Sequence, residues 1–164
     1  LGELLLKTGR VEEARGMLEK AIARRPDQPE VRMILSQAYA RTGRVGEATR
    51  QMSEATRLDP SSPSAHAQLA MLFMMQGQPA RAIPEVEQAL KIDPTLYELR
   101  LHLAVIYHDE KRLPECESHL RKAVELRPSD PEPHRLLAGL YEEMGRKEEA
   151  EREMARVREI TGGR

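Results

Sequence analysis

Residues 63–94 read PSAHAQLAMLFMMQGQPARAIPEVEQALKIDP, and this stretch decides the fold because it encodes two amphipathic helices and one turn. Apolar residues recur at helical spacing from Ser64 to Gln76, which predicts a first helix there. Gly77 ends that helix because glycine readily adopts positive φ, and Pro79 suits the first turn of a second helix. Asp93-Pro94 ends the second helix, since a residue before proline avoids the α region. The apolar faces are formed by Ala67, Leu69, Ala70, Phe73 and Met74 and by Ala82, Val86, Ala89, Leu90 and Ile92.

The same pattern recurs every 34 residues along the chain. The prolines that close successive pairs keep this step: Pro26, Pro60, Pro94 and Pro128. Three further columns keep it as well: Ala14, Ala48, Ala82, Cys116 and Ala150; Leu5, Tyr39, Phe73, Tyr107 and Tyr141; and Gly9, Gly43, Gly77, Lys111 and Gly145. A single helix pair cannot bury its apolar faces alone, so the repeats must stack on one another.

These columns resemble the tetratricopeptide repeat family, whose pattern also spans 34 residues. One unit shows the matching residues Leu35, Ser36, Tyr39, Ala48, Met52 and Pro60. The tryptophan slot of the family departs from the pattern and holds Arg32, His66, Arg100 and His134. We expect the two histidines in it to be partly buried packing residues.

The resemblance implies an all-α, right-handed superhelical solenoid of antiparallel helix pairs, with about four and a half repeats. We expect one array over residues 1–164, with a truncated first repeat at 1–28, full repeats at 29–62, 63–96 and 97–130, and a terminal repeat at 131–164. Charged Glu151 and Arg158 on the last repeat suit a terminal position near Arg164. Pro84 stands inside the second helix of its repeat, which predicts a bend or a late helix start there.

The composition of the chain argues against nucleic acid and membrane as binding partners. Basic and acidic residues number 26 and 27, so no global field recruits nucleic acid. No apolar run reaches the length of about 18 residues that a membrane span needs, so we expect no direct membrane insertion. Arg outnumbers Lys 20 to 6 and Asn is absent, which favours a bacterial source with a GC-rich genome. The compartment stays open between cytoplasm and periplasm, because the N-terminus looks truncated and a signal or anchor upstream would be invisible.

Catalytic and metal-binding motifs are absent from the sequence. Lys7-Thr8-Gly9 matches a β-lactamase tripeptide but occupies an inter-helix turn, and no two of the five histidines have the i, i+4 spacing of a helical metal site. Cys116 replaces an alanine of the helix contact, which predicts a buried, inert thiol. We therefore predict no enzyme activity, no cofactor and no metal.

Met71, Met74 and Met75 stand at i, i+3 and i+4 and share one helix face. Four interpretations of this face are possible: core packing between repeats, a copper site, a membrane contact and a recognition surface. A copper site lacks supporting Cys or His in this helix, and a membrane contact lacks a basic flank. Recognition is favoured because Met-rich surfaces adapt to apolar helices or peptides, and packing between repeats remains the alternative.

In the family, the first helices of successive repeats line a concave groove, and the resemblance implies the same here. The groove-lining positions are Met33, Gln37, Ala40 and Arg41; Ala67, Met71, Met74 and Met75; Leu101, Val105, His108 and Asp109; and Arg135, Gly139, Glu142 and Glu143. We expect apolar contact from Met33, Met71, Met74, Met75, Leu101 and Val105, and polar orientation from Gln37, Arg41, His108, Asp109 and Arg135. The Asn-containing carboxylate clamp and the Asn ladder known in this family cannot be transferred, because the chain has no Asn.

The favoured function is a non-catalytic scaffold that binds a peptide or helix segment of a protein partner in the groove. Two alternatives remain open. The array is a structural spacer or a self-association module that uses the apolar N-terminal end, where Leu1, Leu4, Leu5 and Leu6 gather. Otherwise it is the regulatory arm of an enzyme whose catalytic domain lies outside this chain.

Overall fold

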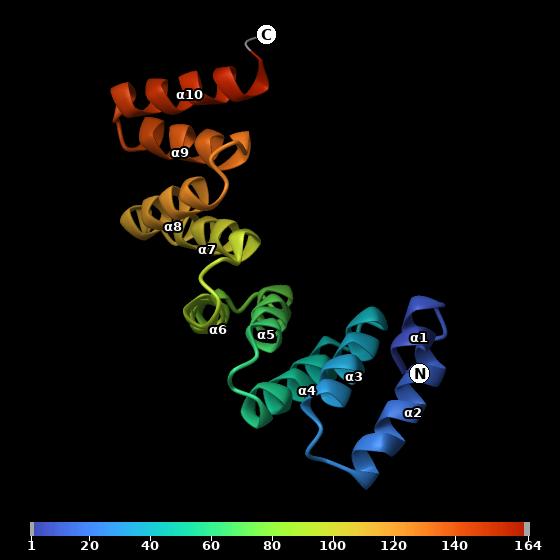
Figure 1. Ribbon diagram of the computed structural model, residues 1–164. Helices are drawn as coiled ribbons and strands as arrows, with labels where there is room; N and C mark the ends of the chain where they lie inside the picture. Colours follow the sequence, from blue (N-terminus) through green and yellow to red (C-terminus); the bar gives the residue numbers. More distant parts are fainter. Residues whose placement is uncertain (1, 163–164) are drawn as a thin grey trace. The chain divides into compact units, whose positions relative to one another are not determined.

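The chain is a series of α-helices joined by short turns, and the computed structural model describes residues 2–162 (Figure 1). The helices are α1 (Gly2–Lys7), α2 (Val11–Arg24), α3 (Pro29–Arg41), α4 (Val45–Leu58), α5 (Pro63–Met75), α6 (Pro79–Ile92), α7 (Tyr97–Asp109), α8 (Leu113–Leu126), α9 (Pro131–Glu143) and α10 (Lys147–Thr161). The predicted all-α class and the repeated helix pairs are confirmed. The expectations that involve Leu1 and Arg164 concern positions outside the described residues.

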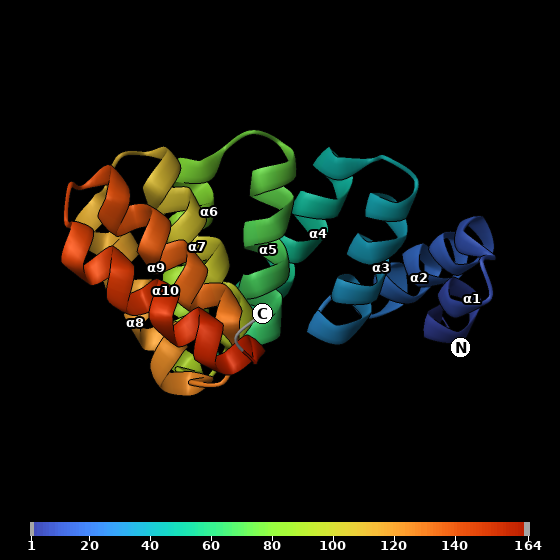
Figure 2. The same ribbon diagram turned by 90° about the horizontal axis from the view of Figure 1, so that it is seen from above.

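The helices group into two compact units, residues 1–94 with α1–α6 and residues 95–164 with α7–α10. Each unit is built from pairs of consecutive helices, as the repeat predicts: α3 packs on α4 and α5 on α6 in the first unit, and α7 packs on α8 and α9 on α10 in the second. Figure 2 shows α9 and α10 lying side by side, as they also do in Figure 1. The single array over residues 1–164 remains a prediction.

Small buried residues set the distance between the two helices of each repeat. Ala14, Ala48 and Ala82 are completely buried, and Cys116 and Ala150 in the same column are 3% exposed. A methyl group at this position lets two helix backbones approach closely, and larger side chains then fill the space around it. The aromatic column of Tyr39, Phe73, Tyr107 and Tyr141 is buried as well. The core is therefore the one that the repeat predicts.

The turn between the two helices of each repeat needs a residue with positive φ. Gly9, Gly43, Gly77 and Gly145 have φ between 67° and 78°, and Lys111 takes φ 59° in the same slot of its repeat. A side chain in this left-handed region meets a steric penalty that glycine avoids. Among these five turn residues, Lys111 is therefore the one whose side chain makes the positive-φ conformation strained.

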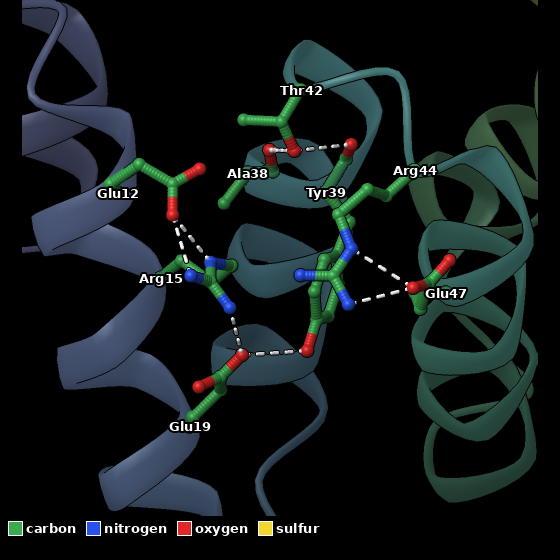
Figure 3. A network of polar contacts seen from close by, with 8 residues as sticks. All are labelled: Glu12, Arg15, Glu19, Ala38, Tyr39, Thr42, Arg44 and Glu47. Carbon is green, nitrogen blue, oxygen red and sulfur yellow. Dashed lines mark hydrogen bonds and ion pairs between the residues drawn. The ribbon is translucent and has the colours of Figure 1, made fainter.

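An arginine–glutamate pair follows most of these turns, and the sequence analysis did not find it. Its arginine stacks on the buried aromatic ring of the same repeat while it pairs with a glutamate three residues later: Arg44 lies 4.8 Å from the centre of the Tyr39 ring and 2.7 Å from Glu47 (Figure 3). Arg112 with Glu115 on Tyr107, and Arg146 with Glu149 on Tyr141, repeat the arrangement. The charged group thereby covers the edge of the core with a cation–π contact.

Tyrosine hydroxyls connect neighbouring repeats through a shared carboxylate. In the first unit the Tyr39 hydroxyl donates to Glu19 of α2 at 2.8 Å, and Arg15 holds the same carboxylate at 3.1 Å (Figure 3). In the second unit the Tyr141 hydroxyl and Arg146 bind Glu117 at 2.9 Å and 2.7 Å. Burial raises the pKa of Glu117, but the hydrogen bonds outweigh burial and leave that pKa lowered. The carboxylate is therefore held ionised at the repeat interface.

The expected late start of the second helix near Pro84 is wrong. Helix α6 begins at Pro79 and continues through Pro84 to Ile92. A proline at this depth removes one backbone hydrogen bond, but Ala82, Ile83 and Val86 are buried and hold the first turns in place. Packing therefore outweighs the local preference. The alternative expectation of a bend stays a prediction.

Replacing Lys111 by glycine should stabilise the second unit. Removing the side chain relieves the positive-φ strain, and the larger entropy loss of glycine offsets part of the gain, so we expect about 0.5–1 kcal/mol. Thermal unfolding followed by circular dichroism should show a midpoint a few degrees higher. Gly145→Lys is the matched reverse change and should lower the midpoint. A lower midpoint for Lys111→Gly would mean that the exposed pair of Lys111 with Glu143, at 3.0 Å, outweighs the strain.

Candidate partner-binding site

The predicted site residues all lie on the first helices of their repeats, and they fall in both units. The first unit carries Met33, Gln37 and Arg41 on α3 and Met71, Met74 and Met75 on α5. The second unit carries Leu101, Val105, His108 and Asp109 on α7 and Arg135 on α9. A single groove through all of them stays a prediction, and each unit is described by itself below.

The three methionines of α5 form an exposed apolar face. Met71, Met74 and Met75 are 54%, 42% and 61% exposed. The opposite side of the same helix is buried through Ala70, Leu72 and Phe73, which fixes the direction of the face. Helix α5 is also fixed at its start, where the Ser62 hydroxyl accepts a hydrogen bond from the Ala65 amide. These methionines, called the methionine face below, are therefore presented on a rigid helix and do not pack inside their unit.

The polar residues predicted on α3 are engaged with neighbouring helices. Gln37 donates to the side chain of Gln68 on α5 at 2.9 Å. Arg41 donates to the carbonyl of Leu6 at 2.6 Å and so satisfies one of the carbonyls at the end of α1. Met33 is half-buried on the same helix. These positions link α3 to α1 and α5, so Arg41 has a structural partner as well as an exposed position.

In the second unit a pocket of about 230 Å³ opens between α7, α8 and α9. It brings together three of the predicted site residues, Val105, His108 and Arg135. Leu101 is half-buried one turn before Val105, and Asp109 is exposed beside His108. The pocket is completed by Ala104, Cys116, Leu120, Leu136, Gly139 and Leu140. Its lining is largely apolar, which suits an apolar side chain.

Gly139 keeps this pocket open. It lies inside α9 and is exposed, and a Cβ atom built on it meets nothing within 4 Å. Glycine inside a helix costs about 0.5–1 kcal/mol relative to alanine, so packing does not explain its presence. The repeat places Gln37, Met71 and Val105 in the same column, each with a longer side chain. The missing side chain at Gly139 therefore leaves space on α9 that the other repeats fill.

Cys116 forms part of the pocket floor and is 3% exposed, so the predicted buried thiol is confirmed. Burial, followed by the charges of Glu143 and Glu117, raises the pKa of the Cys116 thiol to about 11. A thiol with so high a pKa holds little thiolate at neutral pH and reacts slowly. Its role at the pocket is to provide a small apolar surface.

Charged groups of opposite sign stand at the edge of the pocket. His108 pairs with Glu143 at 2.7 Å and Lys111 pairs with the same carboxylate at 3.0 Å. Hydrogen bonds from Lys111 and then from His108 lower the pKa of Glu143. Arg135 lies toward the other end of α9, where it forms a loose ion pair with Glu132 at 3.8 Å and contributes to the lowered pKa of Asp130. The site therefore combines an apolar centre with an available guanidinium group on one side.

The histidines of the former tryptophan slot are buried, as expected, and they also pair with glutamates. His66 Nδ1 lies 2.6 Å from Glu85, and His134 Nδ1 lies 2.6 Å from Glu153. Sequence reasoning missed these partners, although both pairs have the same separation of 19 residues. Each pair joins the two helices of one repeat, which is a structural role.

Within residues 2–162, no group of three or more His, Cys, Asp or Glu side chains is arranged to hold a metal ion. In the same part of the chain, no helix has the length and apolar character required to span a bilayer.

Comparison with family models decides the family. Two tetratricopeptide repeat models match, one at residues 1–63 and 47–97 and the other at residues 73–132 and 117–163. The chain belongs to the tetratricopeptide repeat family. A comparison with curated proteins gives no significant match in sequence.

Solved structures of this family have the same fold. A crystal structure of MamA is 18% identical with a TM-score of 0.89, and the match covers 99% of this chain and 95% of that one. A second MamA structure, MSR-1 C2, is 27% identical with a TM-score of 0.79 and coverage of 98% and 92%. YrrB, described as a TPR protein with an unusual peptide-binding site, is 18% identical with a TM-score of 0.83 and coverage of 97% and 82%.

Replacing Gly139 by alanine should stabilise the protein by about 0.5–1 kcal/mol, because the new methyl group enters open space and alanine favours the helix. Gly16→Ala is the matched control, since Gly16 also lies inside a helix with nothing within 4 Å. Both variants should unfold at higher temperature by calorimetry. A destabilised Gly139→Ala beside a stabilised Gly16→Ala would show that the space beside Gly139 is filled.

Proposed function

We propose that this chain is a non-catalytic interaction scaffold that binds a segment of a protein partner along the first helices of its repeats. The partner segment is a peptide or helix that carries apolar side chains. In this proposal the repeats at 29–62, 63–96, 97–130 and 131–164 act as one array and line a common concave groove.

The methionine face carries this proposal. An exposed helix face with apolar residues at i, i+3 and i+4 matches the spacing with which an amphipathic helix presents its own anchors. Thioether side chains are flexible and polarisable, so they adapt to partners of different shape. The repeat does not require methionine at these positions, because Gln37, Ala40 and Arg41 occupy them one repeat earlier. Binding of an apolar partner gives these exposed side chains a function that folding does not.

The pocket of the second unit supports the same function. Its volume of about 230 Å³ accepts one large apolar side chain of a partner as an anchor. Arg135 beside it suits a carboxylate of the partner, whereas the Glu143 carboxylate near His108 is already paired with Lys111 and His108. A cation on one side of an apolar pocket favours one direction of the bound segment.

The likeness to YrrB is consistent with peptide binding as a use of this fold. Fold alone does not identify a partner, and the residues of this chain must supply the specificity. The absence of Asn argues against the family's Asn-based clamp. In place of that clamp, we propose that Arg41 and Arg135 bind carboxylates of the partner.

The proposal predicts that polar substitution of the methionine face weakens peptide binding. Peptides selected from a random displayed library on the unmodified chain should bind the triple variant Met71→Gln, Met74→Gln, Met75→Gln about thirtyfold more weakly, because about 2 kcal/mol of apolar contact is lost. Affinities are measured by fluorescence anisotropy. Circular dichroism should remain unchanged, since glutamine is a good helix former and the residues are exposed.

Met17→Gln and Met154→Gln serve as controls, because these methionines are 41% and 37% exposed but lie on second helices. Both should keep full affinity. Equal binding by the triple variant and the unmodified chain would refute the proposal. If no peptide is enriched and light scattering shows a mass that rises with concentration, self-association replaces peptide binding.

A further inference from the structure

A second, polar pocket lies in the first unit and shares no lining residue with the methionine face. It has a volume of about 620 Å³ and lies between α4 and the residues that begin at Gln76 after α5. Three arginines line it: Arg50 and Arg57 on α4, and Arg81 on α6. We call it the arginine pocket.

The arginine pocket has an excess of positive charge. Glu54 is the one carboxylate among its lining residues, and Arg57 holds that carboxylate at 2.6 Å. Within residues 2–162, Arg50 makes no hydrogen bond or ion pair. The pKa of Glu47 is lowered first by the hydrogen bond from Arg44, and the charge of Arg50 adds the smallest of its contributions. Arg81 donates to a neutral group, the side-chain oxygen of Gln78, at 3.0 Å. Two guanidinium groups are thus left without a carboxylate.

This charge arises where one repeat departs from the others. The turns elsewhere carry arginine followed three residues later by glutamate, as in Arg44–Glu47 and Arg112–Glu115. The third repeat has Gln78 in the arginine slot and Arg81 in the glutamate slot. Arg81 still stacks on the aromatic ring of its repeat, 4.1 Å from the centre of Phe73. The stacking contact is kept while the neutralising acid is lost.

The interface between α4 and α5 also lacks the carboxylate that accepts a tyrosine hydrogen bond at the α2–α3 and α8–α9 interfaces. Glu19 at the α2–α3 interface and Glu117 at the α8–α9 interface each accept a hydrogen bond from a tyrosine hydroxyl. The matching positions on α4 are Ser53 and Thr49, and the matching ring is Phe73, which has no hydroxyl. Gln76 donates to the Thr49 hydroxyl at 2.9 Å in their place. Neutral donors and acceptors therefore replace both carboxylates.

The corresponding pocket in the second unit has the opposite sign. It has a volume of about 400 Å³ and is lined by Arg121 and Arg152 but also by Glu125, Glu149 and Glu153. Glu125 and Glu149 occupy the columns of Arg57 and Arg81. Repeats therefore stack with either a positive or a negative net charge in this pocket, so repeat stacking does not explain the positive charge of the arginine pocket.

We propose that the arginine pocket binds the carboxylates of an acidic segment of a protein partner. Arginine binds carboxylates through two parallel N–H donors, and the two available guanidinium groups stand on different helices, α4 and α6. A wide pocket with separated cations fits two side chains of a peptide better than one compact phosphate group. The site is distinct from the methionine face and uses charge where that face uses apolar contact.

The test uses a fluorescein-labelled peptide of alternating glutamate and serine, with the same peptide carrying glutamine in place of glutamate as the neutral probe. We expect binding of the acidic peptide only, weakened severalfold when salt rises from about 0.05 M to 0.5 M. The double variant Gln78→Arg, Arg81→Glu restores the order found in the other repeats and should bind about tenfold more weakly. Arg50→Gln should weaken binding about threefold.

Arg152→Gln is the matched control, since Arg152 lines the corresponding pocket of the second unit, and it should bind as the unmodified chain does. The triple variant of the methionine face should also keep its affinity for the acidic peptide, which separates this site from the proposed function. Thermal unfolding of each variant confirms the fold. Equal binding of the neutral peptide, or full affinity in the double variant, overturns the proposal. Displacement of the peptide by inorganic phosphate at equal concentration overturns it too, because the pocket would then be a phosphate site.

Discussion

The close approach of two helices at a small buried residue, alanine in most repeats and Cys116 in one, is the contact on which each repeat depends. Ala48 and Ala82 have no exposed surface, and Ala55 and Ala89 on the same helices have none either. A larger residue at these points would separate the helices and open the core around the aromatic column. The turn that joins the helices must reverse the chain within a few residues, which is why the glycine slot has positive φ. These two constraints recur in every repeat, and they leave the exposed side of the first helices free to vary.

Much of the fold was predictable because the same turn and packing residues recur in each repeat. The end of α5 just before Gly77 and the start of α6 at Pro79 follow from turn and helix-start preferences, and the structure confirms both. The predicted late start of α6 at Pro84 was wrong, because the local preference of proline is weaker than the burial of Ile83 and Val86 on either side. Contacts between columns were harder to predict. The His66–Glu85 pair and the stacking of Arg44 on Tyr39 depend on the packing angle of the helices, which a list of similar residues does not contain.

The candidate sites became visible as departures from the repeat. Spacing placed the methionines of α5 on one helix face and the family resemblance implied that this face is exposed; the structure shows all three side chains exposed. The pocket beside Gly139 could not be predicted, because its volume depends on Cys116 and Leu120 from another helix. The neutral Gln78 in the arginine slot and the basic Arg81 in the glutamate slot were visible in the sequence. Its meaning needed the structure, which shows that Arg81 keeps its contact with Phe73 while its charge faces a pocket.

The central claim is that the repeat columns build the fold while the exposed departures from them bind the partner. Methyl NMR of the chain labelled with ¹³C at its methionine methyl groups tests this most directly, because methionines occur in both classes. Met52 is 1% exposed and belongs to a core column, whereas Met71, Met74 and Met75 form the methionine face. Adding a selected binding peptide should shift the signals of the three α5 methionines and leave that of Met52 in place. Unchanged signals from the methionine face, with shifts at Met17 or Met154 instead, would contradict the account.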